Sequence, residues 1–187
     1  MNRPRVTLKL ATSLDGRIAT ASGESRWITS EASRAEVQKM RAAHDAVMIG
    51  AGTARADDPS LLARTEPPPA KQPMRVVLSK HFDVPTSGRL FQSLDDSPLI
   101  VLGAAVERSH QVIAAGARIG YVVNDGPQVD IELALHTLWL EWKIESVFVE
   151  GGGQVAASLI VAGAVNRIEW FRAPIILGGE GRPAVAA

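Results

Sequence analysis

The chain of 187 residues contains no cysteine, a single tyrosine and few aromatic residues, which make up 5% of the total. Without cysteine it has no disulfide bond, thiolate nucleophile or cysteine-ligated metal, and its four histidines lack metal-ligand spacing, so we predict no metal site. Lys and Arg together number 20, as do Asp and Glu, so no net charge attracts nucleic acid or an anionic membrane. No apolar run approaches membrane-spanning length, and no apolar signal region precedes the first strand-like run. These absences favour a cytoplasmic protein.

What the sequence does contain is typical of one α/β domain. Apolar residues make up 46% and charged residues 21%, and the length suffices for one sizeable core, so we treat residues 1–187 as a single domain. Strand-like runs alternate with helical patterns, which predicts a mainly parallel central sheet flanked by helices on both faces. The expected strands are 6–12, 46–50, 75–79, 99–103, 118–123, 146–150 and 167–177. The expected helices are 30–43 with Ser30 as N-cap, 107–115, 131–142 and 154–162, and 65–72 is expected to be an exposed, proline-rich loop.

A lysine within the first strand is the most informative single feature. The strand alternates apolar and polar residues and places Lys9 between Leu8 and Leu10, before a loop of small polar residues. A strand of this kind normally keeps its charges at the ends or outside, so Lys9 indicates a site.

A glycine turn follows the strand expected at 146–150 and opens the next helix. Its sequence is Glu150-Gly151-Gly152-Gly153-Gln154. Glycines there let the backbone approach a pyrophosphate, and a helix N-terminus supplies N–H donors. The spacing is neither that of the usual dinucleotide fingerprint nor that of a P-loop, so a plain tight turn is an equal alternative. A carboxylate at a strand's C-terminal end lies where α/β proteins bind ligands.

Other segments leave two interpretations open. The turn at residues 50–53 is a second point where a ligand could approach the backbone, and Asp57-Asp58-Pro59 would end a helix or contribute a carboxylate. Arg41 and Arg64 are either solvated charges or, if brought together, a phosphate clamp. Trp27 lies in a polar loop and either packs on the core or stacks on a ring.

Taken together, these segments resemble the reductase domain of the bifunctional riboflavin-biosynthesis deaminase-reductase, in that family's order and over almost the whole chain. The resembling segments are residues 9–17, 23–29, 41–42, 50–53, 57–64 and 149–152. The resemblance implies a dihydrofolate-reductase-like fold, NADPH as cofactor, and reduction of the ribosyl group of 5-amino-6-(5-phosphoribosylamino)uracil to a ribityl chain by hydride transfer to C1′ of the ring-opened imine. With no cysteine for a deaminase zinc site, the chain would be a stand-alone reductase module. The alternatives are a related NADPH reductase of another pterin-like or pyrimidine substrate, and a non-catalytic NADPH-binding module.

The resemblance also implies roles for individual residues. Lys9 would hydrogen-bond the ribose oxygen and promote ring opening, Glu150 would fix the sugar hydroxyls, and Lys9 and Asp57 are alternative proton donors. The implied cofactor residues are Thr12, Trp27, Thr53, Asp57, Ser79, Lys80, Gly151, Gly152, Gly153, Gln154, Val155 and Ser158, with Ser79 and Lys80 assigned to the adenosine 2′-phosphate. The implied substrate residues are Lys9, Ser25, Thr29, Arg41, Leu61, Arg64 and Glu150, with Arg41 and Arg64 suited to the 5-phosphate.

Two departures from the family pattern and one assembly state complete the expectations. Leu62 stands where the family usually has threonine, and the family's further C-terminal strands are expected to be missing after residue 187. The resemblance implies a homodimer, for which Ile168, Trp170 and residues 175–177 are the expected interface.

Overall fold

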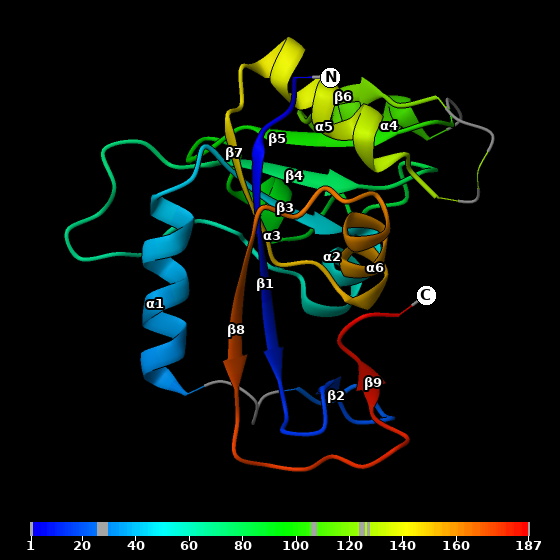
Figure 1. Ribbon diagram of the computed structural model, residues 1–187. Coiled ribbons are helices and arrows are strands. Elements are labelled where there is room, and N and C mark those ends of the chain that lie inside the picture. Colours follow the sequence, from blue (N-terminus) through cyan, green and yellow to red (C-terminus); the bar gives the residue numbers. More distant parts are fainter. Residues whose placement is uncertain (1, 26–29, 106–107, 124–125, 127, 187) are drawn as a thin grey trace.

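Seven parallel strands form the central sheet of the protein. The computed structural model describes residues 2–25, 30–105, 108–123, 126 and 128–186. The strands are β1 (Arg5–Thr12), β2 (Arg17–Ala19), β3 (Ala46–Gly50), β4 (Met74–Leu78), β5 (Leu99–Gly103), β6 (Arg118–Tyr121), β7 (Ser146–Val149), β8 (Arg167–Arg172) and β9 (Arg182–Pro183). The helices are α1 (Glu31–Ala42), α2 (Ala51–Asp57), α3 (Arg89–Gln92), α4 (Ser109–Ala114), α5 (Ile131–Trp142) and α6 (Gly153–Val161). The sheet order is β6-β5-β4-β3-β7-β1-β8 (Figure 1), and β2 and β9 form a separate antiparallel pair.

Side chains that alternate along the strands give the sheet two buried faces. Val6 and Leu8 belong to a core that α5 and α6 cover, whereas Val47 and Ile49 belong to a second core with residues of α1, α2, α3 and α4. Figure 1 shows α1 on one side of β1 and α6 on the other. The predicted parallel sheet with helices on both faces is therefore confirmed.

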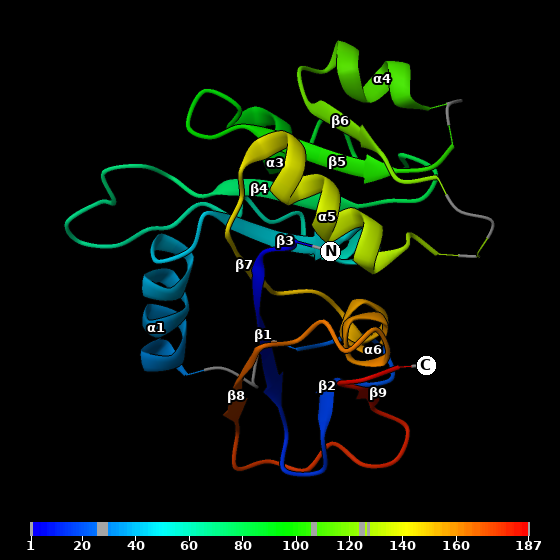
Figure 2. The same cartoon turned by 45° about the horizontal axis from the view of Figure 1, so that its top comes forward.

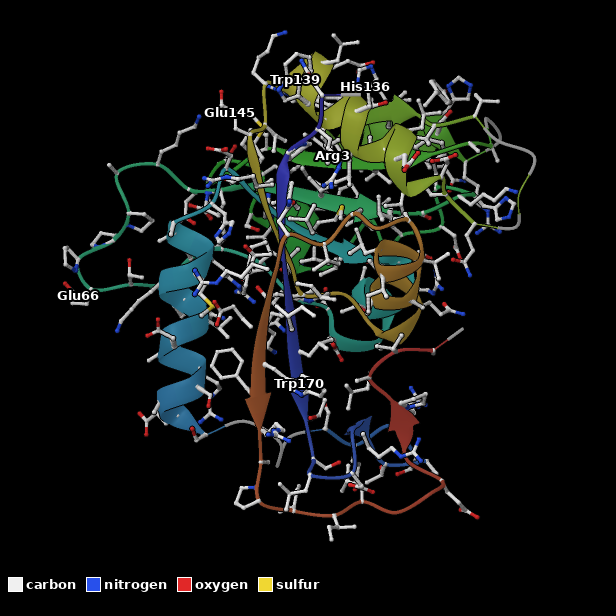
Figure 3. All side chains as sticks on the ribbon, in the orientation of Figure 1. Arg3, Glu66, His136, Trp139, Glu145 and Trp170 are labelled. Carbon is white, nitrogen blue, oxygen red and sulfur yellow. The ribbon has the colours of Figure 1, made fainter. Side chains whose placement is uncertain are left out.

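Most elements begin where local sequence signals predict. Ser30 caps α1, because its side chain accepts a hydrogen bond from the Ser33 N–H at 3.1 Å. Asp130 caps α5 in the same way, accepting from the Leu133 N–H at 3.0 Å. The proline-rich segment predicted as a loop has no regular structure, and its Glu66 lies well away from the sheet (Figure 3).

Other expectations about the elements were wrong. The expected turn at residues 50–53 is the beginning of α2, which ends before Asp58, in the left-handed conformation at φ 40°, and Pro59. The last strand was predicted to reach residue 177 but ends at Arg172, because Pro174 has no N–H to continue the ladder. The helix expected at 107–115 is only Ser109–Ala114, with residue 107 outside the described residues. Elements β2, β9 and α3 were not predicted.

The C-terminal segment returns to the first turn of α6. β9 pairs with β2, and the Ala184 N–H donates to the Gly16 carbonyl at 3.1 Å. The Ala186 N–H then donates to the Gly153 carbonyl at 3.0 Å. Figure 2 shows β2 and β9 side by side next to α6. The last described residues therefore support the glycine turn that the sequence singled out.

The carboxylate of Asp15 holds the loop after β8 against the turn after β1. It accepts hydrogen bonds from the Leu177 N–H at 3.1 Å, from the Gly178 N–H at 2.8 Å and from the Ser13 hydroxyl at 2.6 Å. The Ser13 hydrogen bond, followed by the backbone donors, lowers the pKa of Asp15 to about 2.

A buried arginine joins the segments around β4. Arg75 is fully buried, and its guanidinium donates to the carbonyls of Ser60, Leu90, Ser93 and Ser97. Burial lowers the pKa of Arg75 to about 10. The guanidinium thus satisfies carbonyls between α2 and β4, at the end of α3 and before β5.

Candidate active site

Parallel strands bring several predicted residues to one edge of the sheet. The C-terminal ends of β3, β4 and β7 lie together because these strands run in the same direction. Leu8 pairs with Val149, so the next residues, Lys9 on β1 and Glu150 after β7, lie side by side.

A buried ion pair joins α1 to the end of β7. Arg41 donates from Nε to Oε1 of Glu150 at 2.5 Å and from Nη2 to Oε2 at 3.0 Å. Its Nη1 donates to the Leu62 carbonyl at 3.0 Å, and the Glu150 N–H donates to the Met48 carbonyl at 3.0 Å. The two side chains are only 10% and 11% exposed, so the bidentate pair fixes the carboxylate with little solvent around it.

Lys9 lies half-buried beside this pair. Burial lowers the pKa of its ammonium, Glu150 raises it, Arg41 lowers it and Asp57 raises it, and the net result is a pKa below the ordinary value. Among the described residues its ammonium has no hydrogen-bond partner. A half-buried lysine with a lowered pKa and unused N–H donors is suited to donate a proton or a hydrogen bond to a ligand.

The other residues predicted to bind substrate range from buried to exposed. The Leu61 side chain is 2% exposed within the core at φ 59°, so only its backbone can contact a ligand. Arg64 is exposed, and its N–H donates to Oε1 of Gln38 at 2.8 Å. Arg41 is occupied by Glu150, so Arg64 is the more accessible of the two arginines predicted to form a clamp. Ser25 is exposed, and Trp27 and Thr29 lie outside the described residues.

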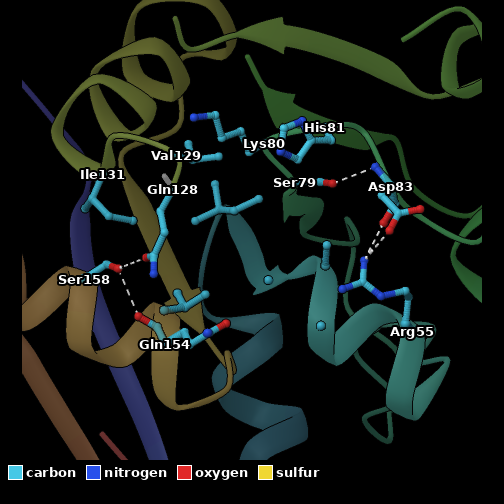
Figure 4. A pocket seen from close by; sticks show the side chains of 15 residues that line it. Arg55, Ser79, Lys80, His81, Asp83, Gln128, Val129, Ile131, Gln154 and Ser158 are labelled. Carbon is cyan, nitrogen blue, oxygen red and sulfur yellow. Dashed lines mark hydrogen bonds and ion pairs between the residues drawn. The ribbon is translucent and has the colours of Figure 1, made fainter. Parts of the chain in front are cut away.

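A pocket of about 300 Å³ lies beyond the ends of β3 and β4 (Figure 4). On one side Ser158 donates to Oε1 of Gln128 at 2.8 Å and to the Gln154 carbonyl at 3.0 Å. On the opposite side are Arg55 and Asp83. Of the predicted cofactor residues, Ser79, Lys80, Gln154, Val155 and Ser158 line this pocket.

The glycines near this pocket fall into two groups. A Cβ on Gly151 would lie 2.8 Å from Cβ of Val155, and one on Gly153 would lie 2.8 Å from the Pro183 carbonyl, so packing alone requires both glycines. A Cβ on Gly52 would meet nothing within 4 Å, and one on Gly152 would lie 3.4 Å from Oγ1 of Thr53. Packing therefore requires glycine neither at position 52 nor at position 152. Because Gly52 lines the pocket, its backbone is accessible to a ligand bound there.

Two further predicted residues lie outside the pocket lining. Thr12 is fully buried on β1, and its hydroxyl accepts a hydrogen bond from Nε1 of Trp170 at 2.8 Å. Asp57 is exposed at the end of α2, close enough to Lys9 to raise its pKa. Thr53 follows Gly52 on the same helix and faces Gly152.

Comparison with known proteins decides the family. The profile of the family described as the RibD C-terminal domain matches residues 4–186. The chain belongs to this family. This RibD-family chain is 38% identical over 185 residues to the riboflavin biosynthesis protein RibD of Bacillus amyloliquefaciens, across 97% of the chain and 48% of the relative. It is 34% identical over 179 residues to the 2,5-diamino-6-ribosylamino-4(3H)-pyrimidinone 5′-phosphate reductase of Methanothermobacter thermautotrophicus, across 95% of the chain and 81% of the relative.

Solved structures agree with the family assignment. The RibD-family chain superposes on Acinetobacter baumannii RibD with a TM-score of 0.85 and 30% identity, covering 99% of this chain and 50% of that one. It shares its fold with the riboflavin biosynthesis reductase Rib7 of Saccharomyces cerevisiae, with a TM-score of 0.75 and 24% identity over 97% of this chain and 78% of that one. The predicted dihydrofolate-reductase-like fold is therefore confirmed, and the chain spans about half the length of the RibD relatives it matches.

The sequence interpretation missed several residues of the pocket in this RibD-family chain. Arg55, His81, Asp83 and Gln128 all line it. Arg55 lies one helical turn after Gly52, and His81 follows Lys80 directly, so both were within reach of the sequence signals already noted. Gln128 comes from a segment with no such signal.

Two negative findings concern the described part of the chain only. It holds no group of three or more His, Cys, Asp or Glu side chains arranged to bind a metal ion. None of its helices combines the length and the apolar character needed to cross a membrane.

Proposed function

We propose that this chain is an NADPH-dependent reductase of riboflavin biosynthesis, which converts the ribosyl group of 5-amino-6-(5-phosphoribosylamino)uracil to a ribityl chain. The observation that carries the proposal is the half-buried Lys9 beside the Arg41–Glu150 pair, at the same sheet edge as a pocket with open backbone. Membership of the RibD C-terminal domain family supports it. The chain acts in the cytoplasm, as its reaction requires a soluble phosphorylated pyrimidine.

In this proposal Lys9 acts on the ribose. Its ammonium hydrogen-bonds the ring oxygen and gives up a proton as the ring opens, which a lowered pKa favours. Glu150 accepts hydrogen bonds from the sugar hydroxyls with the lone pairs that Arg41 leaves unused, and Arg41 is a positioning residue for that carboxylate. The exposed Arg64 binds the 5-phosphate. Asp57 is the alternative proton donor.

We propose that the pocket receives part of a nicotinamide dinucleotide. Open backbone at Gly52 and Gly152 gives room for phosphate oxygens, and the first N–H groups of α6 point from the same turn. Val129 and Ile131 offer an apolar wall for a base, and Ser79 offers a hydroxyl. When bound, NADPH supplies the hydride for C1′. The remaining parts of the cofactor are proposed to contact Thr12, Thr53, Gln154, Val155 and Ser158.

The test is NADPH oxidation with freshly prepared 5-amino-6-(5-phosphoribosylamino)uracil, using parent protein, Lys9→Met and Arg64→Gln. We expect turnover by the parent, its loss in Lys9→Met, and in Arg64→Gln a raised KM with a smaller change in kcat, because a phosphate contact stabilises substrate and transition state alike. NADPH binding without turnover of any pyrimidine would indicate a binding module and overturn the proposal.

A second substrate is specifically favoured by one relative. The reductase of Methanothermobacter thermautotrophicus, of which this chain covers 81%, is named for a 2,5-diamino-6-ribosylamino-pyrimidinone 5′-phosphate. The two compounds differ in the pyrimidine ring and share the ribosyl phosphate that Lys9, Glu150 and Arg64 are proposed to contact. Parallel assays with both compounds decide, because turnover of the diamino compound alone would replace the uracil.

We also propose a homodimer formed through β8. This strand is at the edge of the sheet, with Ile168 and Trp170 47% and 55% exposed. In the loop that follows, Ile176 is 74% exposed. Light scattering after size-exclusion chromatography should give twice the chain mass for the parent and one chain mass for Ile168→Lys; a monomeric parent would refute the assembly.

A further inference from the structure

The pocket beyond β3 and β4 is lined by more basic than acidic side chains. Its lining includes Arg55, Lys80 and His81 but only one carboxylate, that of Asp83. Asp83 accepts from Nη1 of Arg55 at 3.1 Å and from Nη1 of Arg108 at 2.5 Å, so its single negative charge is shared between two arginines. The pocket therefore retains positive charge for an anionic ligand.

Lys80, the residue first assigned to the 2′-phosphate, is engaged elsewhere. Its ammonium donates a hydrogen bond to the Gly126 carbonyl. Figure 4 shows Lys80 at the top of the pocket beside Val129, away from Arg55 and Asp83. A phosphate at this end would have to draw the lysine off a carbonyl partner.

Arg55 and Ser79 are the better-prepared pair. Arg55 uses Nη1 for Asp83, at both the carboxylate and the backbone carbonyl, while its Nε and Nη2 have no partner among the described residues. Ser79 is 4% exposed, and its hydroxyl oxygen accepts the Asp83 N–H at 2.8 Å. The hydroxyl proton of Ser79 meets no acceptor within the described ranges, so it can be donated into the pocket.

We infer that Arg55 and the Ser79 hydroxyl, rather than Lys80, bind the 2′-phosphate of the cofactor and so determine a preference for NADPH over NADH. Asp83 is a positioning residue, because it holds Nη1 of Arg55 and the hydroxyl oxygen of Ser79 at once (Figure 4). A guanidinium with two unused donor groups matches a phosphate dianion in charge and in fork geometry. The inference rests on the proposed function and adds the selectivity residues.

The test measures binding rather than turnover. Isothermal titration of the parent with 2′,5′-ADP and with ADP, which differ only in the position of one phosphate, gives a selectivity ratio independent of any pyrimidine. We expect Arg55→Gln to weaken 2′,5′-ADP by about 10- to 100-fold, the range for a charged hydrogen-bonded contact, and ADP by less than about threefold. Lys80→Gln should change either affinity by less than about threefold.

Controls separate selectivity from damage to the fold. Arg118→Gln removes the same charge at the N-terminal end of β6, whereas the pocket lies beyond the C-terminal ends of β3 and β4. This variant should leave the ratio of the two affinities unchanged. The thermal midpoint of Arg55→Gln should match the parent, because the Arg55–Asp83 pair is 49% and 50% exposed.

The outcomes distinguish this inference from the proposed function. The inference is overturned if the ratio of the affinities for 2′,5′-ADP and ADP is unchanged in Arg55→Gln, or if it falls in Lys80→Gln instead. Either result leaves the reductase proposal unaffected. A parent that binds neither nucleotide overturns both. A parent that selects 2′,5′-ADP through Arg55 but reduces no pyrimidine supports the inference and refutes the proposed substrate.

Discussion

Replacing Glu150 by glutamine tests whether the ion pair at the site is a structural element as well as a substrate contact. The amide keeps the size of the side chain and one acceptor oxygen, but leaves the Arg41 guanidinium, about one-tenth exposed, without its counter-charge. Removing one partner of a buried pair costs about 3–5 kcal/mol. Arg41 retains the Leu62 carbonyl at 3.0 Å and one amide oxygen, so we expect a smaller loss, about 2–3 kcal/mol in the free energy of unfolding.

Urea denaturation and thermal melts measure this loss. For a chain of this size, 1 kcal/mol corresponds to roughly 2–4 °C, so the melting temperature should fall by about 4–12 °C. The matched control is Glu36→Gln on α1, whose partner Lys39 at 3.1 Å is 69% exposed, and it should cost less than about 0.5 kcal/mol. If Glu150→Gln unfolds no more easily than Glu36→Gln, the pair does not hold α1 to β7 in the way we describe.

Three further changes follow from the same reasoning. Because burial lowers the pKa of Lys9, its ammonium destabilises the fold at every pH below that lowered pKa. Lys9→Met should therefore raise the free energy of unfolding at neutral pH in urea melts while abolishing turnover, and a less stable variant would contradict this. Gly52→Ala has room for its methyl group and should stabilise the protein by roughly 0.5 kcal/mol in urea melts. If the ligand approaches the backbone at Gly52, the same change should weaken NADP⁺ binding about tenfold in titration calorimetry. Unchanged binding would exclude such an approach. The pKa of Asp15 measured by NMR should be about 2. The stability that its carboxylate contributes is therefore complete above its ordinary pKa of 3.8 and is lost as the pH falls towards 2. A measured pKa near 3.8 would mean that the Leu177 and Gly178 contacts are absent in solution.

The fold was predictable where the signal is local. The cap at Ser30 and the apolar runs of the central strands depend on neighbouring residues, and they appear where expected. The early end of β8 depends on Pro174, and α2 was not predicted because Gly52 weighs against a helix locally. Only in α2 does tertiary packing outweigh local preference, because the proline that ends β8 is visible in the sequence.

The site was predictable as separate charges and not as an arrangement. Lys9 was singled out as a charge within an apolar strand and Glu150 as a carboxylate at the C-terminal end of a strand. The structure places them next to each other. The pairing of Arg41 with Glu150 joins residues 109 positions apart, and no spacing rule encodes it, because packing of α1 on the sheet decides it. For the same reason Lys80 was assigned to the 2′-phosphate from its place after a strand, whereas the contact of its ammonium with the Gly126 carbonyl joins residues 46 positions apart.

The place of β1 in the sheet bears on how the protein is made. β1 lies between β7 and β8, so Arg5 pairs with Ser146 and Thr7 with Arg167, whereas β3, β4, β5 and β6 pair with neighbours in chain order. During synthesis β1 leaves the ribosome before β7 and β8, and it stays unpaired until they have followed. Strands β3 to β6 can pair with one another before β1 pairs with β7 and β8. Lys9 lies beside Glu150 only once β1 and β7 have paired, so a chain in which these strands are still apart has no assembled lysine, glutamate and arginine with which to act on a sugar.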